Sequence, residues 1–376
     1  MNPYRGLRVL DFGQGIASPY TGHLLALNGA EVIKVEPPEG DWGRWISHRP
    51  EGDISVMFAA YNRGKRSIVL DLKKSDDHAV ARRLADQADV VIEAFRPGVM
   101  RRMGLDYATL QKTNPNVVYV SISGFGQDGP NAERRCSDSV VQAFSGLAAM
   151  NKGNDGVPHR VGVFAGDVIT GLFGFMAVQS ALAARARGDG GRYLDVDLAQ
   201  GTAALVATQV ATAAATGNDG DVSNVPAGSY QTNDGYIVVS LVKEAHFVAL
   251  CEAIGRPDMA KDSRFSSNPL RGQHEGELRG IFRDVFRTAS TEIWLERLKA
   301  ADVLGDRIMT PKDMLTDAHF AARQGMMTFA QPVLGSVTIP RVSGQPDGSA
   351  LSPAPTLGQH TAEILAEITP AAADRK

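Results

Sequence analysis

Cysteine is scarce in this sequence, because its 376 residues contain only Cys136 and Cys251. Two cysteines cannot build a disulfide framework, and such sparing use is typical of proteins of a reducing cytoplasm. Neither cysteine has a second one in CxxC spacing, and the eight histidines show no HxxxH pattern. Since zinc and related ions need several such ligands at close spacing, we expect no metal site.

An excess of charge of one sign is also missing. The 39 lysines and arginines are nearly balanced by 42 aspartates and glutamates, which leaves a net charge of -3. This balance gives no electrostatic reason to expect nucleic acid or an anionic membrane as a partner.

The sequence also lacks a clear membrane or export segment. No basic stretch leads into an apolar one near the N-terminus, so no signal peptide is expected. The apolar run over 168–184 is interrupted by glycines and followed by Arg185 and Arg187. It is marginally short for a membrane span, and a buried core helix is the better interpretation. We therefore expect a cytoplasmic protein of enzyme size.

The first 125 residues alternate short β-rich runs with helical ones. We predict strands over 7–12, 31–35, 67–72, 89–94 and 117–123, a later strand over 193–198, and helices over 18–27, 78–87 and 201–216. Strands that alternate with crossover helices predict an α/β fold with a parallel sheet covered on both faces.

The length exceeds that of a usual single core and favours two domains. A Gly-, Asn- and Asp-rich segment marks the end of a large domain, 1–216. A small α+β domain covers 225–320, with linkers at 217–224 and 321–324. In the small domain a hairpin turns at Asn233-Asp234-Gly235. Further helices are predicted over 244–254, 275–287, 290–301, 312–323 and 361–368, and a tail strand over 333–339.

The most informative stretch of the chain surrounds Asp167, which lies between a glycine-containing loop and a long predicted helix. Apolar residues recur at helical spacing along this helix, and small residues form a second stripe where another backbone can approach. The apolar stripe is Ile169, Leu172, Phe173 and Met176, and the small stripe is Gly171, Gly174, Ala177 and Ala181. Asp167 falls at the N-cap or first turn, where free N–H groups and the helix dipole favour a carboxylate. The structural alternative is that Asp167 only caps the helix.

A glycine-containing loop, Gly13-Gln14-Gly15, follows the first predicted strand and opens a helix. With Glu36 at the end of the second strand, this pattern leaves a dinucleotide site open as an alternative. Pro19 and Tyr20 speak against it, because both would crowd a pyrophosphate turn.

Several blocks in order along the chain resemble the class III CoA-transferase family, which includes formyl-CoA transferase, carnitine CoA-transferase and alpha-methylacyl-CoA racemase. These blocks are residues 6–12, 17–21, 29–38, 62–72, 95–100 and 355–361, together with Gly166-Asp167 and the Val-Ile-Thr-Gly that follows. The resemblance implies a large Rossmann-like domain, which the tail 325–376 completes, a smaller α+β domain and an interlocked homodimer. It implies coenzyme A or acyl-CoA as substrate and no permanently bound cofactor.

The resemblance also implies which residues contact CoA: Gly15, Ile16, Ala17, Leu70, Lys73, Ala94, Phe95, Arg102 and Arg135. Leu70 and Phe95 are expected to sandwich the adenine, while Lys73, Arg96 and Arg102 are expected to meet the phosphates. Several of these residues end predicted strands, where open α/β sheets bind ligands, so a rule independent of the family supports them. For each basic residue alone, the simpler alternative is a solvated surface charge.

By the same resemblance, Asp167 is the catalytic residue. Its carboxylate would be acylated to a mixed anhydride and then converted to an aspartyl-CoA thioester. The loop 124–130 would border the thioester pocket, and backbone N–H groups would stabilise the oxyanions.

Two departures from the family pattern keep other functions open. The segment 225–230 has no glycine run to serve as a lid, and Ser137 stands where racemases of the branch have histidine and transferases often have tyrosine. Serine is a poor base for an alpha proton, which argues against racemisation. Glu244 lies near the position of a racemase acid/base glutamate, so a racemase-type isomerase remains an alternative, as does an acyl-CoA-binding protein without turnover.

Overall fold

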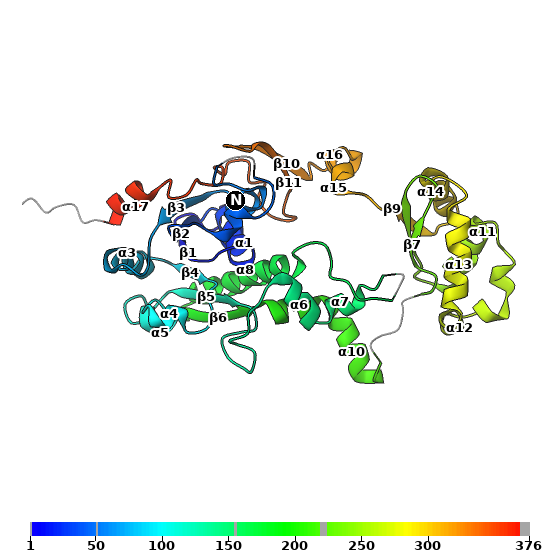
Figure 1. Ribbon diagram of the computed structural model, residues 1–376, viewed down its shortest axis with the longest axis horizontal. Helices are drawn as coiled ribbons and strands as arrows, with labels where there is room; N and C mark the ends of the chain where they lie inside the picture. The colour runs from blue at the N-terminus through cyan, green and yellow to red at the C-terminus, as the bar shows by residue number, and fades with distance from the viewer. Residues whose placement is uncertain (1, 50–51, 154–155, 219–223, 369–376) are drawn as a thin grey trace, which may run out of the picture. The chain divides into compact units, whose positions relative to one another are not determined.

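The computed structural model describes residues 2–49, 52–153, 156–218 and 224–368. The chain divides into two compact units (Figure 1), one of Met1–Ala207 with Gln324–Lys376 and one of Thr208–Arg323. The residues 217–218 of the predicted linker 217–224 are described, as is Asn224, whereas 219–223 lie outside the described residues.

The first unit is built on a six-stranded sheet in the order β3-β2-β1-β4-β5-β6. Its strands are β1 (Arg8–Asp11), β2 (Glu31–Glu36), β3 (Lys65–Val69), β4 (Val90–Glu93), β5 (Val118–Ser123) and β6 (Arg192–Asp197). All neighbouring pairs are parallel. The strand order reverses direction between β1 and β4, as in dinucleotide-type α/β sheets. The predicted α/β fold class is confirmed.

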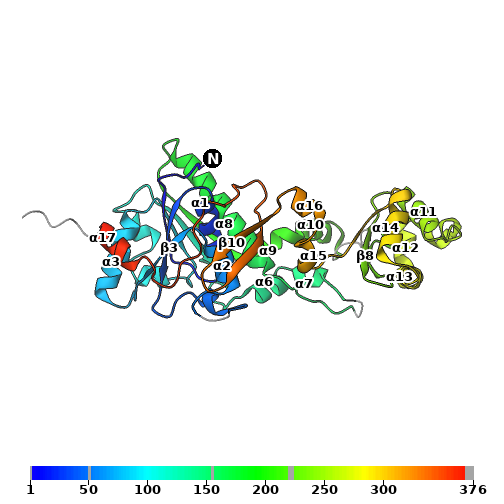
Figure 2. The same cartoon turned by 90° about the horizontal axis from the view of Figure 1, so that it is seen from above.

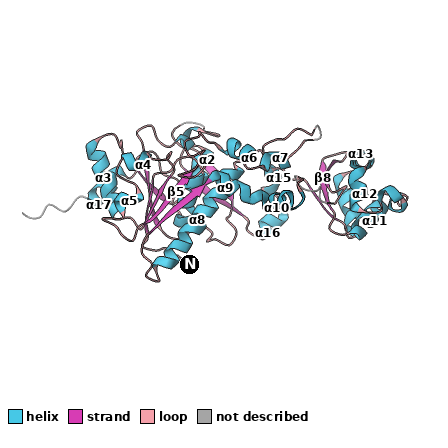
Figure 3. Ribbon diagram, turned by 90° about the horizontal axis from the view of Figure 1, so that it is seen from below, coloured by secondary structure: helices cyan, strands magenta, loops and turns pink. Residues whose placement is uncertain are grey.

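Helices cover both faces of this sheet (Figure 3), as the near-continuous apolar strands require. On one face, α1 (Ala17–Leu27) and α8 (Ala165–Arg185) pack with β4 and β5 around residues such as Leu24 and Val178. On the other face lie α3 (Ser75–Asp86), α4 (Val99–Arg102), α5 (Tyr107–Leu110) and α17 (Thr361–Ile368). Helix α17 lies beside α3 (Figure 2), and its Ile364 is completely buried in this second core.

The remaining elements of the first unit are short. They are η1 (Trp42–Trp45), α2 (Val56–Asn62), α6 (Asp138–Phe144), α7 (Leu147–Met150), α9 (Leu198–Ala203), η2 (Ala204–Val206), β10 (Met326–Gln331) and β11 (Gly335–Pro340). The predicted tail strand is the second arm of a hairpin, because β10 precedes it and pairs with it. The predicted helix over 201–216 is likewise wrong in outline, since it is divided into α9, η2 and α10 (Ala207–Thr216).

Helix α8 buries a different face from the one its apolar residues suggest. Gly171 and Gly174 pack directly on α1, where a Cβ atom would lie 2.8 Å from the Ala17 carbonyl and 2.6 Å from Thr21 Oγ1, respectively. Met176, from the apolar stripe, is 56% exposed. The small-residue stripe was therefore predicted correctly as a close helix contact, and burial of the apolar stripe was not. Among the described helices, α8 has the length and apolarity of a membrane span, but it packs as a core helix of this unit.

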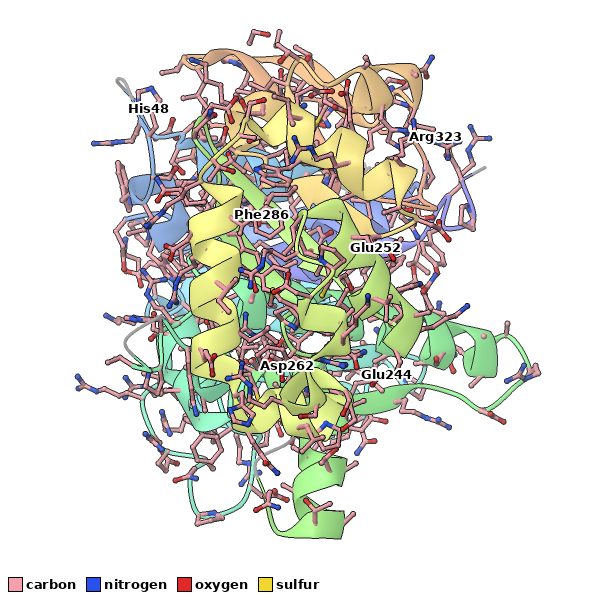
Figure 4. All side chains as sticks on the ribbon, turned by 90° about the vertical axis from the view of Figure 1, so that its right-hand side faces the viewer. His48, Glu244, Glu252, Asp262, Phe286 and Arg323 are labelled. Atoms are coloured by element: carbon pink, nitrogen blue, oxygen red, sulfur yellow. The ribbon has the colours of Figure 1, made fainter. Side chains whose placement is uncertain are left out.

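The second unit is a three-stranded antiparallel sheet with helices. Its sheet has the order β7 (Gly228–Gln231), β8 (Tyr236–Ser240) and β9 (Leu304–Arg307). Its other helices are α11 (Glu244–Ala253), η3 (Met259–Lys261), η4 (Ser263–Phe265), α12 (Asn268–Gln273), α13 (Glu275–Phe286), α14 (Thr291–Ala300), α15 (Pro311–Met314) and α16 (Ala318–Ala322). Aromatic side chains fill the core, including Phe286 on α13 (Figure 4) and Trp294 on α14. The predicted hairpin is confirmed, whereas the helix predicted over 312–323 is interrupted where Asp317 caps α16.

We predict that Gly174→Ala lowers the free energy of unfolding by about 1–3 kcal/mol, because the added methyl group collides with Thr21 in a closely packed helix contact. Calorimetric unfolding measures this change. Gly162→Ala is the matched control in the same unit, since nothing lies within 4 Å of its Cβ position. An equal effect of the two substitutions would contradict the close contact.

Candidate active site

A cavity of about 500 Å³ surrounds Asp167 at the carboxyl end of the parallel sheet. Loops that follow β1, β4 and β5 contribute its walls, together with the first turns of α6 and α8. Its lining includes Gln14, Ala17, Trp42, Ala94, Phe95, Arg96, Ser123, Arg134, Arg135, Ser137, Asp138 and Asp167. The cavity therefore opens where the strand order reverses, which is where sheets of this topology bind ligands.

Asp167 is in the first turn of α8, as predicted, but it does not cap the helix. Among the described residues, none donates a hydrogen bond to its carboxylate. The backbone N–H groups of Gly166 and Asp167 instead donate to Asp138 Oδ1, at 2.8 and 3.3 Å. The capping carboxylate thus comes from α6, and the half-buried carboxylate of Asp167 faces the cavity.

Burial raises the pKa of Asp167 to about 7, and the neighbouring carboxylate of Asp138 raises it further in the same direction. The expectation that the helix start favours ionised Asp167 was therefore wrong. Asp138 already occupies the positive end of the helix and takes its first N–H groups. A carboxylate that is less stabilised is a stronger nucleophile once it ionises.

Asp138 is itself held in place by Gln142, one turn further along α6. Gln142 Nε2 donates to Asp138 Oδ2 at 2.6 Å, and Gln142 Oε1 accepts from the Val161 N–H at 2.8 Å. This arrangement ties the loop before α8 to α6. The sequence analysis missed Asp138 because its partners lie 28 and 29 residues away, and no local pattern links them.

The loop after β1 is closed on itself rather than open to a phosphate. A Cβ atom on Gly13 would lie 1.7 Å from Ser18 Oγ, and one on Gly15, whose φ is +80°, would lie 2.0 Å from Trp42. The Gly15 N–H donates to Asp41 Oδ1 at 2.8 Å. Asp41 therefore already occupies this donor, and Ile16 is buried. Contact of Gly15 and Ile16 with CoA stays a prediction. Ala17 does line the cavity.

Buried ion pairs of Lys34 and Lys65 hold the loop after β1 in this conformation. Lys34 Nζ donates to the Gly13 carbonyl at 2.7 Å and pairs with Asp41 at 2.8 Å. Lys65 Nζ pairs with Asp11 at 2.8 Å and donates to the Pro19 carbonyl at 2.7 Å. All four charged side chains are completely buried.

Glu36 does not have the free carboxylate that a dinucleotide site would need. It pairs with Arg44, whose Nη2 and Nε lie 2.6 and 2.7 Å from its two oxygens, and it accepts from Ser67 Oγ at 2.6 Å. A carboxylate with these partners cannot also bind the hydroxyl groups of a ribose. The structure therefore has neither a free acidic residue for the ribose of a dinucleotide nor an open loop for its phosphates.

A second cavity, of about 280 Å³, lies beside the first and shares Phe95 and Gln14 with it. Leu70, Lys73 and Phe95 all line it, together with Phe12 and Val35. The structure thus brings the predicted adenine-binding pair into one cavity, which Lys73 and the acidic residues Glu36, Glu39 and Asp71 also line. A flat aromatic ring fits between two such apolar side chains.

Arg102 is placed apart from these residues. It lines a third cavity of about 630 Å³, which shares Arg96 and Pro97 with the Asp167 cavity. Ala94 and Arg135 line the Asp167 cavity as expected. Of the predicted CoA contacts, Ala17, Leu70, Lys73, Ala94, Phe95 and Arg135 therefore line the first two cavities, Arg102 lines the third, and Gly15 and Ile16 line none of the three.

Ser137 and Glu244, the two residues that bear on the racemase alternative, belong to different units of the chain. Ser137 is at the N-cap of α6 and lines the Asp167 cavity. Glu244 belongs to the second unit (Figure 4), where it pairs with the buried Arg271 at 2.8 Å. The hydrogen bond from Arg271 lowers the pKa of Glu244, so this carboxylate is a poor proton acceptor. In the same unit, Val225 and Tyr230 of the segment 225–230, which lacks the glycine run of a lid, are buried in the core.

The described residues include no group of three or more His, Cys, Asp or Glu side chains that could hold a metal ion. The cavity of Asp167 also contains cationic and hydroxyl side chains, among them Arg134, Arg135 and Ser137.

We predict that Asp167→Asn stabilises the protein by about 1–2 kcal/mol at pH 8, less than the full shift implies because the carboxylate is half-exposed. A carboxyl whose pKa rises on folding, here from 3.8 to about 7, contributes stability below pH 4 that is lost as the pH rises through 7. Thermal unfolding from pH 4 to 8 measures the difference. The exposed Asp189→Asn is the control, and a constant difference across this range for Asp167→Asn would contradict the raised pKa.

Known proteins resemble this chain over nearly its whole length. The model of CoA-transferase family III matches residues 4–361. The chain is 34% identical to succinyl-CoA–D-citramalate CoA-transferase of Chloroflexus aurantiacus, over 97% of this chain and 94% of that protein. It is also 34% identical to acetyl-CoA:oxalate CoA-transferase of Acetobacter aceti, over 97% and 95%. A CAIB/BAIF family protein from Brucella suis has a similar structure, with a TM-score of 0.84 and 33% identity over 98% of this chain and 100% of that one. The chain therefore belongs to CoA-transferase family III.

Proposed function

We propose that this enzyme transfers CoA from an acyl-CoA to a carboxylic acid through acylation of Asp167. The observation that carries the proposal is the pair of adjoining cavities. One is lined by the carboxylate of Asp167, to which no described residue donates a hydrogen bond, and the other is lined by the apolar side chains of Leu70 and Phe95. A CoA thioester with its adenine in the second cavity would direct its acyl end into the cavity of Asp167.

The carboxylate of Asp167 is the one protein group that forms covalent bonds in the proposed transfer. An Asp167 oxygen attacks the thioester carbonyl, CoA leaves as a thiolate, and a mixed anhydride forms. The thiolate then attacks the Asp167 carbonyl, which releases the donor acid and leaves an aspartyl-CoA thioester. The acceptor carboxylate attacks this aspartyl-CoA thioester, releases the thiolate and forms a second mixed anhydride. The thiolate then attacks the acceptor carbonyl of that anhydride, which forms the new acyl-CoA and regenerates the carboxylate of Asp167.

Cationic groups suit the acid substrates of this reaction. Arg96, Arg134 and Arg135 line the cavity that contains Asp167, and arginine binds carboxylates and phosphates well. The relatives described above are named for transfer to or from small acids, including succinate, citramalate, acetate and oxalate. We propose that the substrates of this enzyme belong to the same class of small carboxylic acids.

A racemase-type isomerase is the weaker candidate. It needs a second acid/base group opposite Asp167, and Ser137 is the side chain at the relevant position of the cavity. Serine does not remove an alpha proton near neutral pH without a base. The homodimer and the cytoplasmic location implied by the sequence analysis remain predictions.

We predict that incubation with a competent acyl-CoA places an acyl or CoA-derived adduct on Asp167, seen by peptide mass spectrometry with and without borohydride reduction. Asp167→Asn should lose at least about 10³-fold in kcat, because the nucleophile is removed, while it still binds CoA. A racemase would exchange the alpha proton of its substrate without an adduct. Binding that survives Asp167→Ala, with no product from the wild type, would show a binding protein instead.

A further inference from the structure

The carboxyl ends of β4, β5 and β6 carry a row of polar side chains beside the candidate active site. Glu93 and Ser121 are register partners across β4 and β5, and Ser121 and Asp195 are partners across β5 and β6. Gln127, from the loop after β5, reaches back to this row. Glu93, Gln127 and Asp195 line the third cavity and not the cavity of Asp167.

Short contacts follow this row from one strand to the next. Glu93 Oε2 accepts from the Phe95 N–H at 2.8 Å. Ser121 lies beside Glu93 as its register partner across β4 and β5, and the Ser121 hydroxyl oxygen accepts from Gln127 Nε2 at 2.7 Å. The Gln127 N–H donates to Asp195 Oδ2 at 3.0 Å. The row thus connects the backbone after β4 with the backbone after β5.

Both of these backbone segments form walls of the candidate site. Phe95 lines both the Asp167 cavity and the second cavity, and Gly124 lines the Asp167 cavity. Glu93 is only 4% exposed, so its bond to the Phe95 N–H is made away from bulk water, where losing it leaves a donor unsatisfied. The orientation of the Phe95 loop therefore depends on a carboxylate that lies outside the cavity of Asp167.

We propose that Glu93, Ser121 and Gln127 are positioning residues that fix the Phe95 loop for CoA binding from outside the cavity of Asp167. This inference rests on the proposed function, since it assumes that Phe95 contacts CoA. These residues are expected to strengthen the binding of CoA and not to act on the transition state. A substitution in the row should therefore raise the Kd for CoA and the KM for acyl-CoA and leave kcat nearly unchanged.

Gln127→Ala tests the row at a half-buried loop residue, where folding is least at risk. We expect calorimetric titration with CoA to show about fivefold weaker binding than the wild type, the usual effect of one lost hydrogen bond. Gln111→Ala, at an exposed position outside the three cavities, is the matched control and should bind CoA as the wild type does. An unchanged Kd for Gln127→Ala would overturn this inference and leave the proposed function intact.

A pair of substitutions at Glu93 separates positioning from general stability. Glu93→Gln keeps an oxygen for the Phe95 N–H and should stay within about threefold of the wild type, whereas Glu93→Ala should weaken CoA binding by more than tenfold. Burial raises the pKa of Glu93 to about 7, so a neutral amide is a fair substitute. Equal Kd values for the two variants, or a fall in kcat at unchanged KM, would overturn the inference. A wild type that binds no CoA would overturn the proposed function as well.

Discussion

The arrangement of the candidate site depends on four charges buried below the loop that follows β1. Lys34, Lys65, Asp11 and Asp41 are all completely enclosed, and each lysine also donates to a backbone carbonyl of this region. Removing one member of such a buried pair typically costs about 3–5 kcal/mol, because the other charge stays buried without a partner. The loop conformation around Gly13 is therefore fixed by charge pairing as much as by its glycines.

This fixed loop also sets the position of the nucleophile. It leads directly into α1, and α1 meets α8 through Gly171 and Gly174, where the two helices are too close for even a methyl group. Asp167 is in the first turn of α8, so its distance from the loop cannot change without breaking this contact. The carboxylate of Asp138 then makes the same turn electrostatically unfavourable for a second negative charge. The result is a rigidly held carboxylate with a raised pKa.

Much of the fold follows from features that the sequence displays openly. The alternation of β-rich and helical runs predicted the parallel sheet, and residues at strand ends, such as Leu70 and Phe95, met in one cavity because parallel strands share a carboxyl edge. Lys34, between Ile33 and Val35 in β2, gave a weaker signal, since a lysine within an apolar strand needs a buried partner.

Other features depended on contacts distant in sequence. Asp138 caps a helix that begins 27 residues later, and no local pattern shows this. The donor of Gly15 is taken by Asp41, 26 residues away, so the loop resembles a phosphate site in sequence but not in structure. The strand β9, with sequence Leu-Gly-Asp-Arg and all four residues exposed, has neither the apolar alternation nor the β-branched residues that predict strands. Its pairing with β8 alone makes it a strand.

If Asp167 is acylated, oxygen atoms of the substrate acids exchange with those of its carboxylate. Turnover with an acceptor acid labelled with oxygen-18 in its carboxylate tests this directly, because the thiolate attacks the acceptor carbonyl of the second anhydride and leaves the bridging oxygen on Asp167. A single turnover should make the peptide containing Asp167 heavier by one oxygen-18 substitution and leave every other peptide unlabelled. An unlabelled Asp167 peptide after many turnovers would contradict acylation of Asp167.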